Sequence, residues 1–161
     1  VVMAATGKKR RELPTQIPDD IDLPVGFSAP RLASAGILLI NGPGCSMTNA
    51  QGDSDLLRLC DYYTSDHPIN GFPLMIVVDD SEFCAATLNN WLWVTFTRSN
   101  PATDLYGIAA WNRNKHWGCD GSVVIDARIK PHHAPPLLDD PDIEKQVDQL
   151  GTAGGPLHGI I

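Results

Sequence analysis

The sequence lacks several patterns that would place the protein outside the cytoplasm or in a membrane. Its four cysteines, Cys45, Cys60, Cys84 and Cys119, are widely spaced and form no CxxC pair. No signal peptide precedes them, so we expect reduced thiols in a cytoplasmic protein rather than a disulfide framework. No apolar run reaches the length that crosses a bilayer, and we therefore expect no membrane partner.

Basic residues are also few. The chain has 12 Lys and Arg against 19 Asp and Glu, which gives a formal net charge of −7. An acidic surface repels the phosphates of nucleic acids and of anionic lipids, so nucleic acid is not an expected partner either. Four basic residues form one block at 8–11, which we interpret as a solvated arm rather than an anion site.

The common catalytic fingerprints are missing as well. There is no GxGxxG, no Gly-Lys-Ser/Thr and no GxSxG, which argues against dinucleotide binding, a P-loop and an α/β-hydrolase serine. The glycine-rich segment 42–49 lies between an expected strand and an expected helix, where backbone N–H groups can cradle phosphate. Pro43 removes one of those donors, so an ordinary tight connection is the favoured interpretation.

The patterns that are present predict one α/β domain with an arm. With 161 residues and 43% hydrophobic content, the chain can bury a proper core. Apolar runs predict buried strands at 36–41, 74–78 and 122–127, and helical spacing predicts helices at 53–63, 88–96 and 142–150. In the second helix the apolar face includes Leu88, Trp91, Leu92 and Phe96, and Trp93 and Val94 widen it. Buried strands that alternate with helices predict a layered, mostly parallel central sheet with helices on both faces.

The first 30 residues differ in composition from the rest. Four prolines, Pro14, Pro18, Pro24 and Pro30, prevent regular helix and favour an extended connector. We therefore divide the chain into a basic and Pro-rich arm at 1–30 and an α/β domain at 31–161. The arm has the composition of a linker to an upstream domain.

Polar residues cluster where the expected strands end. Asp79 and Asp80 follow the strand at 74–78, where open α/β sheets place ligands, although strand termination and helix capping are favoured over acid/base chemistry. Around Pro101, Arg98 and Asp104 form either a polar loop that is held by an Arg–Asp ion pair or an anion-binding site. The structural role is the favoured alternative.

A second group of candidates lies between residues 111 and 133. His116 and Cys119 have a His-x-x-Cys spacing, and a zinc site that they form with His132 or His133 is a further alternative. No second Cys or His stands at zinc-finger spacing, so the favoured interpretation is that the chain has no metal site. Trp117 can form a flat apolar wall for an aromatic ligand, as can Trp111. The basic residues of this region can together form a cationic edge to a pocket: Lys115, His116, Arg128 and Lys130.

Five stretches of the chain together resemble the C-terminal part of the UbiD-like decarboxylases. The resemblance is specific from about residue 72 to residue 150 and thinner back to residue 31. The stretches are VVDD at 77–80, WVTFTRSNP at 93–101, DLYG at 104–107, KHWGC at 115–119 and VIDARIKPHH at 124–133.

This resemblance implies a function for the whole protein rather than for this chain alone. Members of the family remove or add a carboxyl group on aromatic or α,β-unsaturated acids, using prenylated FMN with a divalent metal and potassium. In the family the cofactor and an Arg-Glu-Glu catalytic network lie in a preceding flavin-binding domain. The only glutamates here are Glu12, Glu82 and Glu144, and none is placed like that network. We therefore expect no catalytic or cofactor-binding residue on this chain, and no activity without the flavin domain.

The remaining expectations concern surfaces. As a C-terminal domain, the chain is expected to line part of the substrate cleft and to contribute to a homo-oligomer. The candidate residues for the cleft or interface are Arg98, Lys115, His116, Trp117, Arg128 and His132. The alternative hypothesis is a stand-alone, non-catalytic module for assembly or ligand sensing.

Overall fold

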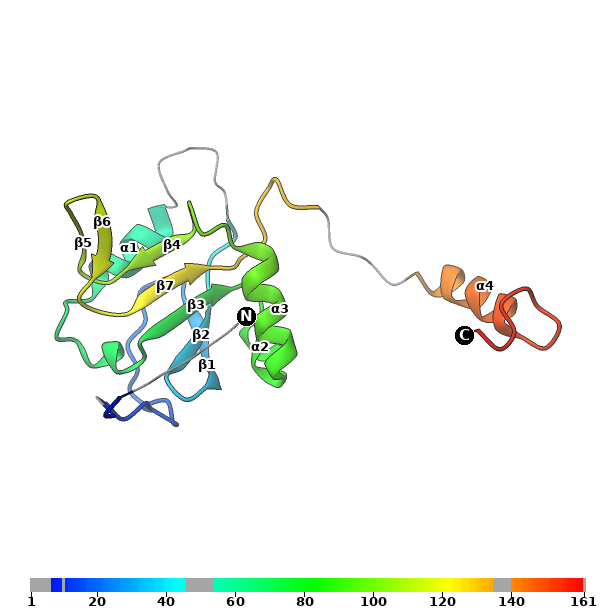
Figure 1. Ribbon diagram of the computed structural model, residues 1–161, viewed down its shortest axis with the longest axis horizontal. Helices are drawn as coiled ribbons and strands as arrows, with labels where there is room; N and C mark the ends of the chain where they lie inside the picture. Colours follow the sequence, from blue (N-terminus) through cyan, green and yellow to red (C-terminus); the bar gives the residue numbers. More distant parts are fainter. Residues whose placement is uncertain (1–6, 10, 46–53, 135–139, 161) are drawn as a thin grey trace.

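The structure, a computed structural model, describes residues 7–9, 11–45, 54–134 and 140–160. Its centre is a mixed sheet of five strands (Figure 1). In spatial order these are β1 (Ser28–Ser34), β2 (Ile37–Asn41), β3 (Leu74–Val78), β7 (Val123–Asp126) and β4 (Leu105–Gly107). The three strands expected from apolar runs are the three central ones, so the prediction of an α/β core is confirmed.

The sheet is less parallel than predicted. β2, β3 and β7 run parallel, whereas β1 and β4 pair antiparallel at the two edges. Only two residues separate β1 from β2, and so short a connection can join only antiparallel neighbours. Gly36 supplies the positive φ of +75° that this turn needs. β1 also shows that the last residues of the proline-rich segment, from Ser28, belong to the sheet.

Successive residues of the central strands point to opposite faces, and each face has its own core. On one face Leu38 and Ile40 pack with residues of α1 (Ser54–Tyr62). On the other face Leu39 packs with residues of α2 (Ser81–Ala86) and α3 (Leu88–Arg98). The predicted helix at 53–63 corresponds to α1, and its proposed cap Asp53 lies outside the described residues.

The helix predicted at 88–96 is present as α3, which extends to Arg98, but its predicted apolar face is wrong in part. Leu88 and Phe96 are 61% and 53% exposed, and Trp93 is 56% exposed. Trp91 and Val94, which belong to the predicted face, are buried, and Thr95, which does not belong to it, is buried as well. A second helix that was not predicted, α2, precedes α3, and Thr87 caps α3 by accepting a hydrogen bond from Asn90 N at 3.1 Å. The break at Thr87 sets the rotation of α3 against the sheet, which spacing within α3 alone does not reveal.

The segment after Gly107, for which no strand was predicted, forms a β-hairpin. Its strands are β5 (Ala110–Arg113) and β6 (His116–Cys119), which pair antiparallel. The turn residues Asn114 and Lys115 both have positive φ angles, 52° and 65°, as a two-residue hairpin turn requires. The hairpin stands beside β4 in Figure 1.

The two ends of the described chain differ in how they meet the sheet. Residues 11–27 form no helix or strand, yet Ile17, Ile21 and Leu23 pack against the core on the α1 side. At the other end α4 (Pro141–Gly151) has no buried residue and lies apart from the sheet (Figure 1). A short 3-10 helix, η1 (Pro68–Gly71), leads into β3. None of the described helices has the length and apolar character that a membrane crossing requires.

Candidate functional site

Two oppositely charged residues next to the carboxyl end of β7 are fully buried. Asp126 ends the strand, and Arg128 donates to it from Nε at 2.9 Å and from Nη2 at 2.8 Å. Arg128 also donates from Nη1 to the carbonyl of Pro43 at 2.7 Å. This arrangement ties the connection after β2 to the connection after β7. Arg128 was a candidate for the substrate cleft, and the structure places its side chain inside the fold.

Lys130 is the second buried cation of this cluster. Its Nζ donates to the carbonyls of Arg98 and Asp126, both at 3.0 Å, and lies 3.2 Å from Asp104 Oδ2. Asp104 also accepts a hydrogen bond from Asn100 N at 2.6 Å. The polar loop around Pro101 is therefore locked, as the favoured interpretation held, but the locking cation is Lys130 rather than Arg98.

Arg98 lies at the solvent side of the same cluster. Its Nη1 donates to Asp79 Oδ2 at 3.0 Å, and the same carboxylate oxygen accepts from Ile129 N at 2.8 Å. The neighbouring Asp80 caps α2 by accepting from Phe83 N at 2.9 Å. Both aspartates after β3 thus have structural roles, in agreement with the favoured interpretation.

His132 and His133 follow the buried cluster, and their rings are 4.7 Å apart. Lys130 N donates to His133 Nδ1 at 3.2 Å, so the proton of the neutral imidazole is on Nε2. Burial lowers the pKa of His133, and the charges of Lys130, His132 and Arg98 lower it further, while Asp104 opposes them. Arg98 and His132 therefore both lie close to His133, near the C-terminal end of α3.

Lys115 and His116 are not part of this cluster. Both are exposed residues of the β5–β6 hairpin, whereas Arg128 and Lys130 are almost completely buried. The predicted cationic edge made by all four residues is therefore wrong. The physical reason is that the chain bends after β7, where Arg128 N donates to Asp126 Oδ1 at 3.1 Å, and this bend brings the side chains of Arg128 and Lys130 to Asp126 inside the fold.

A groove lies beside Trp117, the third hairpin candidate. It has a volume of about 380 Å³ and lies between α1, β4 and the hairpin. Trp117 forms one wall, while Trp111 packs against Gly118 and donates its indole N–H to Asp120 at 2.9 Å. The groove is lined by Leu57, Cys60, Asp61, Leu105, Tyr106, Gly107, Ala109, Ala110 and Trp117.

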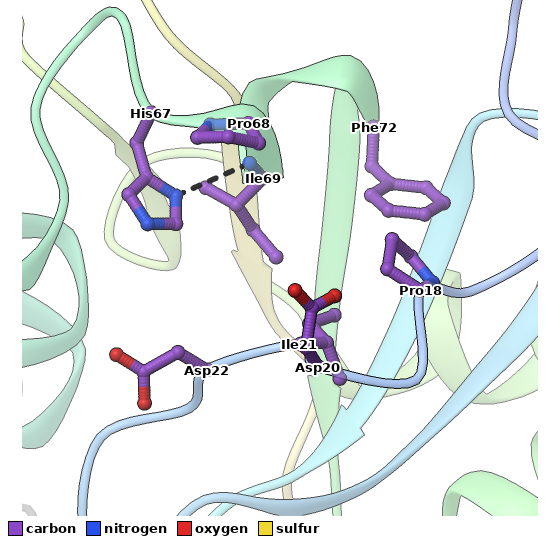
Figure 2. Close-up of a pocket in the computed structure, with 8 residues that line it drawn as sticks. All are labelled: Pro18, Asp20, Ile21, Asp22, His67, Pro68, Ile69 and Phe72. Atoms are coloured by element: carbon purple, nitrogen blue, oxygen red, sulfur yellow. Dashed lines mark hydrogen bonds between the residues drawn. The ribbon is translucent and has the colours of Figure 1, made fainter.

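A second cavity of about 190 Å³ lies between the proline-rich segment and η1 (Figure 2). Asp20, Asp22 and His67 supply its polar groups, and prolines, isoleucines and Phe72 supply the walls. His67 Nδ1 accepts a hydrogen bond from Ile69 N at 3.2 Å, which leaves the imidazole proton on Nε2. A metal needs an unprotonated ring nitrogen, so His67 cannot offer Nε2 to a metal while this bond exists.

Metal ligands do not converge elsewhere in the part of the chain that the structure describes. Among those residues, no three His, Cys, Asp or Glu side chains lie close enough together to hold an ion. Of the predicted phosphate-cradling segment, residues 42–45 are described and form the connection held by Arg128, while residues 46–49 lie outside the described residues.

No family model matches the sequence. The chain is similar to one subunit of a 4-hydroxybenzoate decarboxylase of Chlamydia pneumoniae, with 26% identity over 136 residues. That alignment covers 84% of this chain and 23% of the relative. An uncharacterized protein of Chlamydia muridarum is 30% identical over 76 residues, which cover 47% of this chain and 13% of the relative. The chain thus spans less than a quarter of the length of these relatives.

Among solved structures, the chain is similar to vanillic acid decarboxylase of Sedimentibacter hydroxybenzoicus in its open form. The sequence identity is 19% and the TM-score is 0.39, over 73% of this chain and 27% of that chain. From the chlamydial alignment, the chain is related in sequence to part of a decarboxylase.

Proposed function

We propose that this chain is the C-terminal α/β domain of a decarboxylase that acts on aromatic or α,β-unsaturated carboxylic acids. The observation that carries the proposal is the similarity to the chlamydial 4-hydroxybenzoate decarboxylase, which extends over 84% of the chain. The stretches that resemble UbiD-like decarboxylases coincide with structural parts of the fold. They include the end of β3, the C-terminal half of α3 and the Asp126–Lys130 cluster.

The proposed cofactor is prenylated FMN with a divalent metal and potassium, which supplies the electron sink for decarboxylation when bound. The cavities found in the described part of the chain do not fit this group. The groove beside Trp117 has no basic side chain, the cavity beside η1 has His67, and a third cavity, between residues 16–21 and 30–32, has Arg31, whereas a flavin phosphate is held by several donors. We therefore assign the cofactor to a flavin-binding domain that would act as the partner of this one, and we assign no reaction step to this chain alone.

We propose that the flavin-binding domain and the substrate contact this chain at the edge of the sheet where α3 ends. Arg98 is half-buried and His132 is exposed there, and both are cationic or can become so. A carboxylate substrate is attracted to such an edge. We propose that Lys115 and His116 belong to an interface with another domain or subunit. Arg128 does not contact the substrate in this proposal, and its buried hydrogen bonds with Asp126 and Pro43 hold this edge of the sheet in position.

Contacts between copies are proposed for the exposed helices. Phe83 of α2 and Leu88, Trp93 and Phe96 of α3 are each about half or more exposed. Exposed apolar patches of this kind mark interaction surfaces. They support a homo-oligomer, which we propose to act in the cytoplasm.

The test uses the natural protein purified from its source. Its mass and absorbance spectrum are measured, and release of CO2 from 4-hydroxybenzoate is followed with the wild type, Arg98→Gln and the control Arg113→Gln. Arg113 is an exposed hairpin residue that stacks on Trp111. A larger protein with flavin absorbance, whose activity is lowered by Arg98→Gln and not by Arg113→Gln, is the expected result. A flavin-free protein of 17.4 kDa without activity would contradict the proposal.

The second candidate is a non-catalytic module for assembly or ligand sensing. The observation that favours it is the groove beside Trp117, which does not depend on a flavin domain. A natural polypeptide no longer than this chain, with a ligand bound but no decarboxylation, is the result that would support it.

A further inference from the structure

The groove beside Trp117 has the size and shape of a site for a small organic ligand. Its volume of about 380 Å³ is within the range of about 300–1,000 Å³ typical of such sites. α1 contributes Leu57, Cys60 and Asp61, which share one helix face because they are three and four residues apart. β4 contributes Leu105, Tyr106 and Gly107 to the lining, and the hairpin contributes Ala110 and Trp117.

Large apolar side chains reach solvent together in this groove. Leu57 and Trp117 are each 46% exposed and Leu105 is 39% exposed. Such a concentration of exposed apolar surface is typical of a binding site. Burial raises the pKa of Cys60 to about 12, so its thiol is neutral at physiological pH and belongs to the apolar lining.

The fold holds Trp117 in place through a glycine of β4. A Cβ atom added at Gly107 would lie 3.3 Å from the Trp117 ring and 2.5 Å from Cys119 Cβ. Only glycine leaves room for both side chains, so the indole packs over the backbone of β4. Tryptophan is also the aromatic side chain that binds cations best.

The charge of the groove is negative. Asp61 is the charged residue of the lining, and its carboxylate forms no hydrogen bond or ion pair with any residue that the structure describes. Lys115 and His116 belong to the same hairpin as Trp117 but do not line the groove. An organic cation gains from Asp61 and an aromatic ring gains from packing on Trp117, whereas a carboxylate is repelled by Asp61.

We propose that this groove binds arylalkylammonium ions, with the aromatic ring between Leu57, Leu105 and Trp117 and the ammonium group at Asp61. The ligand has the opposite charge to the carboxylic acid of the proposed function. The site is therefore separate from the proposed decarboxylation, and each proposal can fail without the other.

The test compares three ligands of similar size and different charge: 2-phenylethylammonium, 2-phenylethanol and 3-phenylpropionate. Binding to the 161-residue chain is measured at pH 7 by calorimetry and by chemical shifts of the tryptophan indole N–H. We expect the ammonium ion to bind about twofold to fivefold tighter than the alcohol, in line with exposed ion pairs. The carboxylate is expected to bind most weakly.

Two variants assign the effect to its residues. Asp61→Asn is expected to reduce affinity for the ammonium ion to that for the alcohol, and Asp148→Asn, a carboxylate of α4, is the control that leaves it unchanged. Trp117→Ala is expected to abolish binding of all three ligands. Since Asp61 is exposed, Asp61→Asn is expected to fold normally, which a thermal melt checks.

Three results would overturn the proposal. They are the absence of ammonium binding at millimolar concentration, equal or tighter binding of 3-phenylpropionate, and unchanged ammonium affinity in Asp61→Asn. Tighter binding of the carboxylate would instead make the groove a site for the acid. If the natural protein binds the ammonium ion but does not decarboxylate aromatic acids, only the proposed function is refuted.

Discussion

Arg128 and Asp126 form a two-pronged ion pair in which neither side chain is exposed to solvent, although only one residue separates them in the chain. The backbone conformation after β7 brings the guanidinium back over the carboxylate. The pair then reaches Pro43, 85 residues away in the sequence.

Removing the carboxylate of this pair is predicted to be strongly destabilising. Asp126→Ala leaves Arg128 and Lys130 buried without their shared carboxylate, and breaking a buried pair in this way costs about 3–5 kcal/mol of unfolding free energy. Urea denaturation followed by tryptophan fluorescence measures the loss. The control is Asp55→Ala, which breaks the exposed pair with Arg58 and is expected to cost about 1 kcal/mol or less. Equal losses in the two variants would show that burial does not decide the effect.

Gly42 is predicted to tolerate no side chain, in contrast to Gly44 in the same connection. A Cβ at Gly42 would lie 2.4 Å from Val77 Cγ1 and 2.9 Å from Arg128 Cδ, whereas nothing lies within 4 Å at Gly44. Gly42→Ala is expected to lower the free energy of unfolding by about 1–3 kcal/mol through overpacking. Gly44→Ala is expected to leave it nearly unchanged. Comparable melting temperatures for the two variants would contradict the packing at Gly42.

Thr95 is predicted to be a position where loss of a hydroxyl stabilises the fold. Its Oγ1 is buried and has no hydrogen-bond partner in the described structure. Thr95→Val keeps the shape and removes the unpaired group, so we expect a gain of about 1 kcal/mol in chemical denaturation. Thr97→Val is the control, because the exposed Thr97 hydroxyl donates to Trp93 O at 2.7 Å. A loss of stability in Thr95→Val would indicate that this hydroxyl has a partner in solution.

His133 is predicted to titrate below the ordinary histidine pKa of 6.5, because burial and nearby cations disfavour its charged form. A histidine pKa that is lower in the folded than in the unfolded state stabilises the fold above pH 6.5. That contribution is lost as the pH falls through the folded pKa. Protonation of Nδ1 also breaks its hydrogen bond with Lys130 N. NMR titration is expected to show the His133 ring and the Lys130 amide shifting together.

The control for this titration is His133→Gln, in which the shift of the Lys130 amide with pH is expected to disappear. A His133 pKa at or above 6.5 in the wild type would contradict the role of burial. An amide that still titrates in the variant would assign the shift to another group.

Part of the site was readable from residue spacing and part was not. Arg98, Asp104 and Lys130 were recognised as polar residues near strand ends, and the structure joins them in one cluster. Asp126 was missed as the common partner of Arg128 and Lys130, because the bend after β7 that brings the three side chains together leaves no mark in residue spacing. The residues of the groove carried no such signal, because Asp61 and Leu105 are 44 positions apart and meet only through the packing of α1 on β4.

The sequence by itself determined the three central strands and the positions of α1, α3 and α4. A buried parallel strand requires an uninterrupted apolar run, and an amphipathic helix requires apolar residues at helical spacing. Both patterns are local and can therefore be recognised in the sequence. Only the tertiary structure decided the antiparallel edges, the rotation of α3 and the burial of Arg128. Each of these features depends on which distant part of the chain a segment packs against. The order of the strands in the sheet and the break at Thr87 fix those contacts, and the spacing of residues within one segment does not reveal them.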